Sequence, residues 1–185
     1  MSQLIIAVDV DDVVANLISA WLRLYNNDYG DLVLQEDITN WNIHEFVSIG
    51  HDIYDYLDRP YLYEYVEPID GALWGVNKLR QMGFRVVFVT STNVNQNGQK
   101  LKWLQKYGFL PKNIKFEQDY IEATDKSLIH CDYLIDDKPE NVSHCRGMGL
   151  LFDRPHNQRQ NLPRVSDWLD VISFFEDLQD EQNNE

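Results

Sequence analysis

The 185-residue sequence has few basic residues, only two cysteines and no long apolar run, and each shortage excludes a class of protein. Its 16 Lys and Arg residues stand against 30 Asp and Glu, a formal net charge of −14, so the chain is not a clamp for a nucleic-acid polymer. Cys131 and Cys145 form no CxxC pair and no disulfide framework, which predicts two reduced thiols. Apolar runs such as Leu4 to Val8 fall far short of the roughly 20 residues that span a bilayer.

The N-terminus also lacks the basic region of a secretory signal, because its short apolar run leads straight into Asp9 and Asp11. We therefore expect a cytoplasmic protein without a membrane segment. Residues 176–185 are rich in acids and predict a solvated, fraying C-terminal tail. The body of the chain is different, since a hydrophobic content of 44% with 12% aromatic residues is ample for a buried core.

Short aliphatic runs alternate with helical patterns along most of the chain. The runs are Leu4 to Val8, Phe84 to Val89, Tyr133 to Ile135 and Leu150 to Phe152. Each is followed by acids or hydroxyls. The alternation predicts an α/β fold, a Rossmann-like parallel sheet with right-handed crossovers. Because ligands of such sheets lie beyond the carboxyl ends of the strands, the polar residues there are the candidates for chemistry.

Residues 17–70 interrupt this alternation. They begin with the apolar spacing of an amphipathic helix and contain no convincing core strand. Aromatic residues crowd into the segment instead: Trp41, Phe46, Tyr54, Tyr56, Tyr61, Tyr63 and Tyr65. We predict a mostly helical insertion that stands over the strand ends as a cap. The expected organisation is a core of residues 1–16 and 71–175, a cap of residues 17–70 and an acidic tail of residues 176–185.

Two pairs of acids follow predicted strands. Asp9 and Asp11 come directly after the first run and can turn toward one point at the sheet edge. Their mutual repulsion is relieved by a hard cation, and oxygen ligands suggest Mg²⁺, although a solvated acidic turn is the plainer alternative. Asp136 and Asp137 end another strand, and a helix N-cap before Pro139 accounts for only one of them. Burying both pairs together without a metal would be severely destabilising.

Hydroxyls and lysines supply groups for an anion. Thr90 and Ser91 follow the second run where a helix begins, and their hydroxyls and N–H groups suit a phosphate oxygen. Lys126 precedes the Asp136 strand and can bring a positive charge to the same place. Lys100, on the helix after Thr90, is the competing candidate, and either lysine alone is more often a surface residue.

In their order, these elements resemble the four motifs of the haloacid dehalogenase superfamily, with Asp9-x-Asp11 first, then Thr90, Lys126 and Asp136-Asp137. Within the superfamily the chain resembles the 5′(3′)-deoxyribonucleotidase family from about Leu4 to Phe152. The sequences that carry this likeness are Asp9-Val-Asp-Asp-Val-Val-Ala-Asn16, Glu67-Pro-Ile-Asp-Gly-Ala72 and Leu134-Ile-Asp-Asp-Lys-Pro139. Two residues depart from the pattern, because Asp12 stands where the family usually has Gly and Leu17 where an aromatic residue often faces the base.

The resemblance implies an Mg²⁺-dependent phosphomonoesterase. Asp9 would attack phosphorus to give an aspartyl-phosphate, and Asp11 would serve as general acid and then general base. The metal would be held by Asp9, the Asp11 backbone carbonyl and Asp137. Asp136 is expected to point the other way, toward a metal-bound water or the surroundings of the site. Thr90, Ser91 and Lys126 would hold phosphoryl oxygens.

For the leaving group, the resemblance places five residues near the nucleoside of a nucleoside monophosphate: Leu17, Trp41, Asn42, Ile43 and Tyr56. Each aromatic residue could equally belong to the cap's own core. The five histidines show no HxH or HExxH spacing, so we expect none of them to bind a metal.

Other functions compete with the nucleotidase. The same chemistry could act on a phosphosugar or another small phosphometabolite, because the cap is the least matched part of the chain. A phospho-accepting receiver module also groups acids, Thr and Lys around Mg²⁺, but a receiver has no cap. A binding protein without catalysis is disfavoured, since no motif acid is missing. The sequence leaves base preference, the choice between 5′ and 3′ phosphate and the oligomeric state open, a homodimer included.

Overall fold

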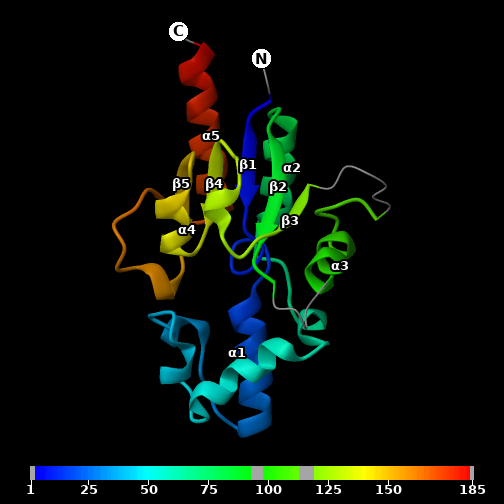
Figure 1. Cartoon of the computed structure of the whole chain (residues 1–185), viewed down its shortest axis with the longest axis vertical. Helices are drawn as coiled ribbons and strands as arrows, with labels where there is room; N and C mark the ends of the chain where they lie inside the picture. Colours follow the sequence, from blue (N-terminus) through cyan, green and yellow to red (C-terminus); the bar gives the residue numbers. More distant parts are fainter. Residues whose placement is uncertain (1–2, 93–97, 113–118, 184–185) are drawn as a thin grey trace.

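The chain forms a parallel sheet with the strand order β3-β2-β1-β4-β5-β6 (Figure 1). The computed structural model describes residues 3–92, 98–112 and 119–183. Its strands are β1 (Ile5–Val8), β2 (Arg85–Thr90), β3 (Tyr120–Glu122), β4 (Tyr133–Asp136), β5 (Met148–Phe152) and β6 (Arg164–Val165). Each neighbouring pair is parallel, which confirms the α/β fold expected from the alternating pattern. The sequence did not predict β3 and β6, because edge strands of three and two residues leave almost no periodic signal.

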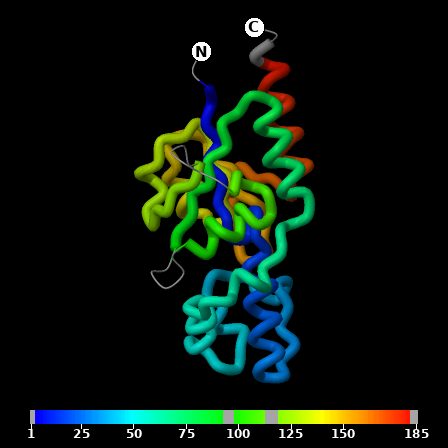
Figure 2. The backbone as a smooth tube through the Cα atoms, turned by 90° about the vertical axis from the view of Figure 1, so that its right-hand side faces the viewer, coloured from blue at the N-terminus to red at the C-terminus, as the bar shows by residue number. Residues whose placement is uncertain are grey.

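Helices cover both faces of the sheet. Helices α2 (Ala72–Gln81) and α5 (Trp168–Asn183) lie side by side on one face, where Gly75 lets the Trp168 ring approach the α2 backbone (Figure 2). A Cβ at Gly75 would lie 2.3 Å from a Trp168 ring carbon, so a larger residue cannot stand there without a shift. The opposite face buries a smaller cluster that includes Ala7, Val87 and Leu134. Two further helices, α3 (Gln99–Lys106) and α4 (Pro139–His144), complete the core.

The acidic C-terminal stretch is helical, and the prediction of a fraying tail from residue 176 is wrong. Helix α5 continues to Asn183 because its last turns still contact the core. Gln179 Nε2 donates to the Met82 carbonyl at 2.8 Å, Lys78 pairs with Glu176 at 3.3 Å, and Leu178 packs against the hydrophobic core. An apolar stripe hidden among acids therefore decides the conformation of this segment.

Residues 17–70 lie beyond the carboxyl ends of the strands (Figures 1 and 2). They form α1 (Leu17–Tyr29) and the 3₁₀ helices η1 (Gln35–Asp37), η2 (Ile43–Glu45), η3 (Gly50–Asp58) and η4 (Leu62–Glu64). Trp21 Nε1 donates to the Ile53 carbonyl at 3.0 Å and so fastens α1 to η3. The aromatic residues of this segment mostly pack against one another and against α1, as in a small core of its own.

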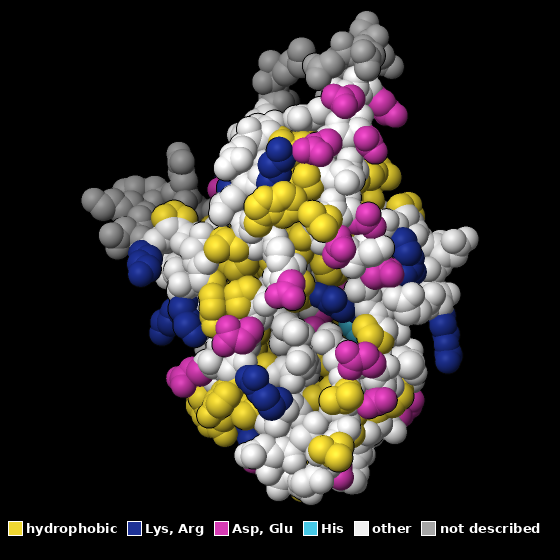
Figure 3. All heavy atoms as spheres, turned by 180° about the vertical axis from the view of Figure 1, so that it is seen from behind, with side chains coloured by type: hydrophobic (Ala, Val, Ile, Leu, Met, Phe, Trp, Pro, Cys, Tyr) yellow, Lys and Arg dark blue, Asp and Glu magenta, His cyan; other side chains and the backbone are white. Residues whose placement is uncertain are grey.

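On the face opposite to that of Figure 1, acidic side chains are scattered among apolar and basic ones (Figure 3). None of the helices in the described ranges is both long and apolar enough to cross a bilayer.

Candidate active site

The chain turns back on itself directly after β1. The Asp9 N–H donates to the Ile135 carbonyl at 2.9 Å, which ties the end of β1 to β4. The Ala15 N–H donates to the Val10 carbonyl at 2.8 Å and closes the loop. Asp12 inside it has φ 53°, and no other non-glycine residue in the described part of the chain has a positive φ. This conformation gives a physical reason for the glycine that the resemblance expects at this position.

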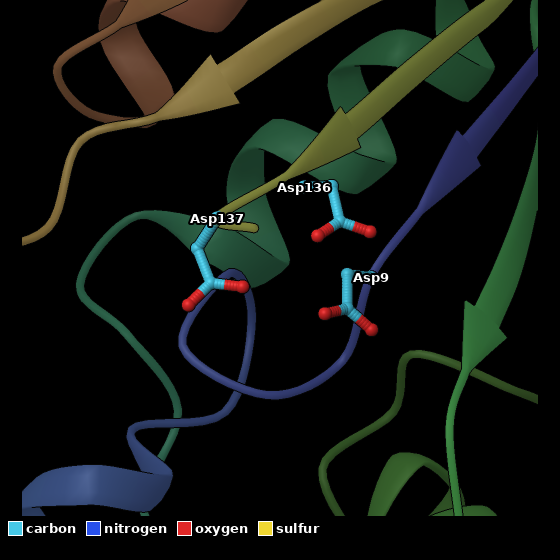
Figure 4. Close-up of side chains that lie close together, drawn as sticks. All are labelled: Asp9, Asp136 and Asp137. Carbon is cyan, nitrogen blue, oxygen red and sulfur yellow. The ribbon is translucent and has the colours of Figure 1, made fainter. Parts of the chain in front are cut away.

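Three carboxylates converge at the ends of β1 and β4. Asp9, Asp136 and Asp137 each offer an oxygen, and these oxygens lie within 4.8 Å of one another (Figure 4). All three residues are buried, with relative exposures of 7%, 0% and 3%. The structure thus brings Asp9 of the first acid pair together with both members of the second pair.

One lysine, Lys126, forms ion pairs with two of these three acids. Lys126 from the 3₁₀ helix η6 (Lys126–Leu128) places Nζ 2.6 Å from Asp9 Oδ1 and 2.7 Å from Asp136 Oδ2. Burial alone would lower the pKa of Lys126, but the two carboxylates raise it above its ordinary value, so the side chain stays charged. If all three acids are ionised, the single ammonium leaves a local charge near −2.

Burial raises the pKa of each carboxyl in the cluster. For Asp9 the pKa rises to about 7, since the loss of water and the nearby acids outweigh the attraction of Lys126. The pKa of Asp136 is raised by burial despite Lys126. The pKa of Asp137 is raised by burial despite a hydrogen bond to His156. The positive charge of Lys126 therefore does not fully offset the cost of burying these carboxylates in their ionised form.

This donor set fits a divalent cation. The oxygens are hard ligands, they are close enough to share one ion, and the charge they leave uncompensated is near the charge such an ion carries. A bound cation would favour the ionised form of the same carboxyls whose pKa burial raises.

Asp136 and Asp137 differ in the partners that they already have. Asp136 lies inside the cluster, whereas the resemblance implied a side chain pointing the other way. Both of its oxygens accept hydrogen bonds: Oδ2 from Lys126, Oδ1 from the Lys138 N–H at 2.9 Å, and both from Asn141 Nδ2 at 3.0 and 3.1 Å. These donors turn the carboxylate inward and occupy it, so it is the member least free to bind a cation directly.

Asp11 lies beside the cluster on a second set of partners. Lys100 from α3 places Nζ 2.6 Å from Asp11 Oδ2, and the Tyr63 hydroxyl from η4 donates to Asp11 Oδ1. The same ammonium lies 2.9 Å from Thr90 Oγ1 and donates to the Ser91 carbonyl. The structure therefore brings both candidate lysines to the site, Lys126 beside Asp9 and Lys100 beside Asp11.

A cavity of about 310 Å³ opens from these acids into residues 17–70. Its polar end contains Asp9, Asp11, Asp12, Asp137, Ser91, Lys126, Lys138 and Asn141. Its other walls are mostly apolar or aromatic: Leu17, Ile18, Trp21, Trp41, Ile43, Tyr54 and Leu57. One end thus suits a charged group and the other a flat apolar one.

The cavity includes some of the residues expected to bind substrate and leaves out others. Leu17, Trp41, Ile43, Ser91 and Lys126 line it. Thr90 is fully buried and does not, because its hydroxyl is taken by Lys100.

Asn42 and Tyr56 also lie away from the cavity. The Asn42 amide is exposed and donates to Glu45 at 2.9 Å. The Tyr56 hydroxyl donates to Asp28 at 2.7 Å, and the Arg59 guanidinium stacks on its ring. Tyr54 and Leu57, its neighbours on η3, line the cavity instead, because a 3₁₀ helix presents only some positions to one side.

Sequence reasoning missed His156 and the role of Tyr63. His156 is buried with Nε2 2.9 Å from Asp137 Oδ2, although the spacing of the histidines gave no sign of it. One signal was present: Pro155-His156-Asn157 follows a predicted strand, and strand ends were the places expected to carry chemistry. Tyr63 carried no such signal, since it is one of ten aromatic residues in residues 17–70.

Known proteins resemble this chain along nearly its full length. The family model described as 5′ nucleotidase, deoxy (Pyrimidine), cytosolic type C protein matches residues 3–179. A 5′(3′)-deoxyribonucleotidase of Clostridium acetobutylicum is 30% identical over 184 residues, which cover 97% of this chain and 99% of that protein. A 5′(3′)-deoxyribonucleotidase of Bacillus subtilis is 33% identical over 171 residues, 90% of this chain and 95% of the relative.

Solved structures share the fold at low identity. The hydrolase of the haloacid dehalogenase-like family SP0104 from Streptococcus pneumoniae has a TM-score of 0.61 at 12% identity and covers 94% of this chain and 98% of its own. The HAD-hydrolase YfnB from Bacillus subtilis, described as bound to magnesium, has a TM-score of 0.60 at 14% identity over 95% of this chain and 100% of that one.

Proposed function

Because the chain belongs to the 5′(3′)-deoxyribonucleotidase family of the haloacid dehalogenase superfamily, we propose that it removes the phosphate of deoxyribonucleoside monophosphates at the site around Asp9. It is a hydrolase that acts on phosphoric monoesters. The observation that carries the assignment to this site is the cavity, whose acidic, lysine-bearing floor continues into apolar walls. A phosphate and a nucleoside have that same sequence of polar and flat apolar parts.

Asp9 is the nucleophile and Asp11 moves the proton. The Asp9 carboxylate attacks phosphorus and forms an aspartyl-phosphate as the ester oxygen leaves. Asp11 enters this step protonated and gives its proton to that oxygen, and the carboxylate so formed later takes a proton from the water that hydrolyses the intermediate. Lys100 and Tyr63 hold the Asp11 carboxylate from two sides, one from α3 and one from η4, and so fix its distance from the reacting atoms.

Asp9, the Asp11 backbone carbonyl and Asp137 would hold Mg²⁺ in this proposal. Bound Mg²⁺ supplies positive charge that neutralises the phosphoryl oxygens and lowers the pKa of the acids around it. Asp136 takes no direct part and instead holds Lys126 and Asn141 in place. The donor set and its uncompensated charge support this division of roles.

Other groups bind the substrate. Lys126 and Ser91, which line the cavity, contact phosphoryl oxygens. Thr90 does not touch the substrate and instead orients Lys100 through a hydrogen bond. Residues 17–70 act as the cap over a core of residues 1–16 and 71–175, and the base lies against Trp41, Trp21 and Tyr54. Aromatic rings offer the flat face of a base a stacking surface.

Two alternatives are less well supported. A phosphosugar would place its hydroxyls against the apolar walls and leave them without hydrogen-bond partners. A receiver module needs an open acidic site, whereas residues 17–70 cover this one. The two free thiols, Cys131 and Cys145, and a substrate class that occurs free in the cytoplasm favour a cytoplasmic enzyme.

The test is phosphate release from a matched panel. Deoxyribonucleoside 5′- and 3′-monophosphates, ribonucleoside monophosphates and deoxyribose 5-phosphate are compared with Mg²⁺ and with EDTA. We expect kcat/KM to be highest for a deoxyribonucleoside monophosphate and to be lost in EDTA. Equal rates for deoxyribose 5-phosphate and the nucleotides would overturn the nucleotide assignment.

A further inference from the structure

One short segment holds both the side chain and the backbone of Asp137. The 3₁₀ helix η7 (Pro155–Asn157) follows β5 and reaches across to the end of β4. His156 Nε2 lies 2.9 Å from Asp137 Oδ2, and Asn157 Nδ2 donates to the Asp137 carbonyl at 2.8 Å. Asn157 Nδ2 also donates to the Phe152 carbonyl at 2.8 Å, which fixes η7 to the strand before it.

The side chains of His156 and Asp137 are almost fully buried from solvent. They are 1% and 4% exposed. His156 Nδ1 is buried and has no hydrogen-bond partner among the described residues. Nε2 is therefore the ring nitrogen within hydrogen-bond reach of the carboxylate, and a hydrogen on Nε2 is donated to Asp137 Oδ2.

The hydrogen bond is made to one oxygen of Asp137 only. Oδ2 accepts from His156, while Oδ1 makes no hydrogen bond to any residue in the ranges that the structure covers. Asp136 beside it has both oxygens occupied. His156 thus holds one oxygen of Asp137, while the other, Oδ1, has no hydrogen-bond partner among the described residues, and this freedom distinguishes the two neighbouring acids.

The other side of the imidazole packs against residues 17–70. The Trp41 ring lies 4.5 Å from the His156 ring, centroid to centroid, at an interplanar angle of 49°. Trp41 also lines the cavity. The imidazole is therefore enclosed between a cluster acid and a wall of the proposed nucleoside site, and it has little freedom to turn.

We infer that His156 is a positioning residue for the divalent cation, which it serves by fixing the Asp137 carboxylate. This inference rests on the proposed function, because it takes Asp137 as a ligand. Partners of ligating groups commonly contribute a factor of 10 to 100 to metal affinity. We expect a loss of that size when the donor is removed, without a matching loss of the fold.

The experiment measures Mg²⁺ binding without substrate, by isothermal titration calorimetry on protein stripped with EDTA. His156→Leu keeps the bulk and removes the donor, His156→Gln keeps an N–H donor, and His130→Leu is a control on an exposed histidine. We expect the Kd for Mg²⁺ to rise 10- to 100-fold in His156→Leu, to rise less in His156→Gln and to stay unchanged in His130→Leu. Thermal unfolding in EDTA should show that the variants are folded. Because the defect is one of affinity, kcat of His156→Leu should recover at Mg²⁺ concentrations above its new Kd.

The outcomes separate this inference from the proposed function. Wild-type affinity in His156→Leu, with a wild-type enzyme that binds Mg²⁺ and hydrolyses nucleotides, would overturn the role of His156 alone. A wild-type protein that binds no Mg²⁺ and releases no phosphate would overturn the proposed function, and the inference with it. If His156→Leu does not fold, unchanged affinity in a folded His156→Asn, whose side chain is too short to reach Asp137, is equally decisive against the inference.

Discussion

Lys126 Nζ lies 2.6 Å from Asp9 Oδ1, and both side chains are nearly excluded from water, at 2% and 10% exposure. This contact places a fixed positive charge beside the proposed nucleophile. Among the described residues Lys126 is also the only cation paired with Asp9, whereas Asp136 and Asp11 both act to raise its pKa. The pair is therefore important for the charge balance of the metal-free site and for phosphate binding.

Replacement of Asp9 should separate chemistry from folding. In Asp9→Asn the amide cannot attack phosphorus, so we expect kcat to fall by roughly 10⁴-fold or more. The fold should persist, because the variant removes one of three clustered negative charges and keeps the side-chain volume. Phosphate release measures the loss of kcat, and thermal unfolding in EDTA shows whether the fold persists. Turnover within tenfold of wild type would contradict the assigned nucleophile.

Replacement of Lys126 should affect the fold as well as the activity. Lys126→Met leaves Asp9 and Asp136 as buried acids without a cation, and breaking such a pair costs about 3 kcal/mol or more. We expect a lower free energy of unfolding in urea, with part of the loss restored by Mg²⁺. Lys78→Met removes a half-exposed ion pair with Glu176 and serves as the control, with a change below about 1 kcal/mol.

The raised pKa of Asp9 predicts a pH dependence of stability. Its folded pKa is about 7 against an ordinary 3.8, so the folded, metal-free protein binds more protons than the unfolded chain between these values. Stability should therefore fall as pH rises from about 4 to 7, by up to about 4 kcal/mol from this group. Exposed acids such as Asp28, whose pKa is lowered by hydrogen bonds to Tyr56 and Arg59, act in the opposite direction.

The comparison that isolates Asp9 is wild type against Asp9→Asn at pH 5 and pH 7.5, both in EDTA. The stability of wild type relative to the variant should be lower at pH 7.5. Mg²⁺ should reverse that difference, because a bound cation favours ionised carboxylates. A gap that stays the same at both pH values would show that Asp9 is not the titrating group.

The apolar walls of the cavity predict that replacing two adjacent residues, Trp41 and Asn42, will affect substrate binding differently. Trp41 lines the cavity and Asn42 does not. At saturating Mg²⁺, Trp41→Ala should raise KM for a deoxyribonucleotide about 5- to 30-fold, which corresponds to the 1–2 kcal/mol of a stacked base, and should leave KM for deoxyribose 5-phosphate nearly unchanged. Asn42→Ala should leave both values near wild type. A large effect of Asn42→Ala would instead support the placement implied by the sequence.

Sequence reasoning succeeded where residues act through chain-local patterns. Buried parallel strands are continuous apolar runs, and their ends are fixed by topology, so Asp9 and Asp137 could be brought together before the structure was known. It failed where a side chain reaches its partner through tertiary packing. His156 meets Asp137 across 19 positions of the chain, and Tyr63 meets Asp11 across 52. Neither spacing forms a pattern within one element, so only the folded structure reveals these pairs.

Asp12 offers a final test, of backbone strain beside the site. It holds φ 53°, and its carboxylate accepts from the Ile18 N–H at 3.3 Å and from Gln35 Nε2 at 3.1 Å. Burial raises its pKa well above the ordinary value, with Asp137 adding to the effect. Asp12→Gly removes the strain together with the carboxylate, whereas Asp12→Ala removes the carboxylate and keeps the strain. The glycine variant should therefore be more stable than the alanine variant by about 1–2 kcal/mol.

Asp12→Asn completes that series, because Asn tolerates this backbone conformation and removes only the charge. In EDTA at pH 7.5 we expect Asp12→Asn to be at least as stable as wild type, since a buried carboxyl with a raised pKa disfavours the fold once it ionises. Urea unfolding of the four proteins gives the strain from the glycine and alanine pair and the charge effect from the Asn variant. Equal stability of the glycine and alanine variants would show that the turn relaxes, and that the positive φ at this position carries no cost.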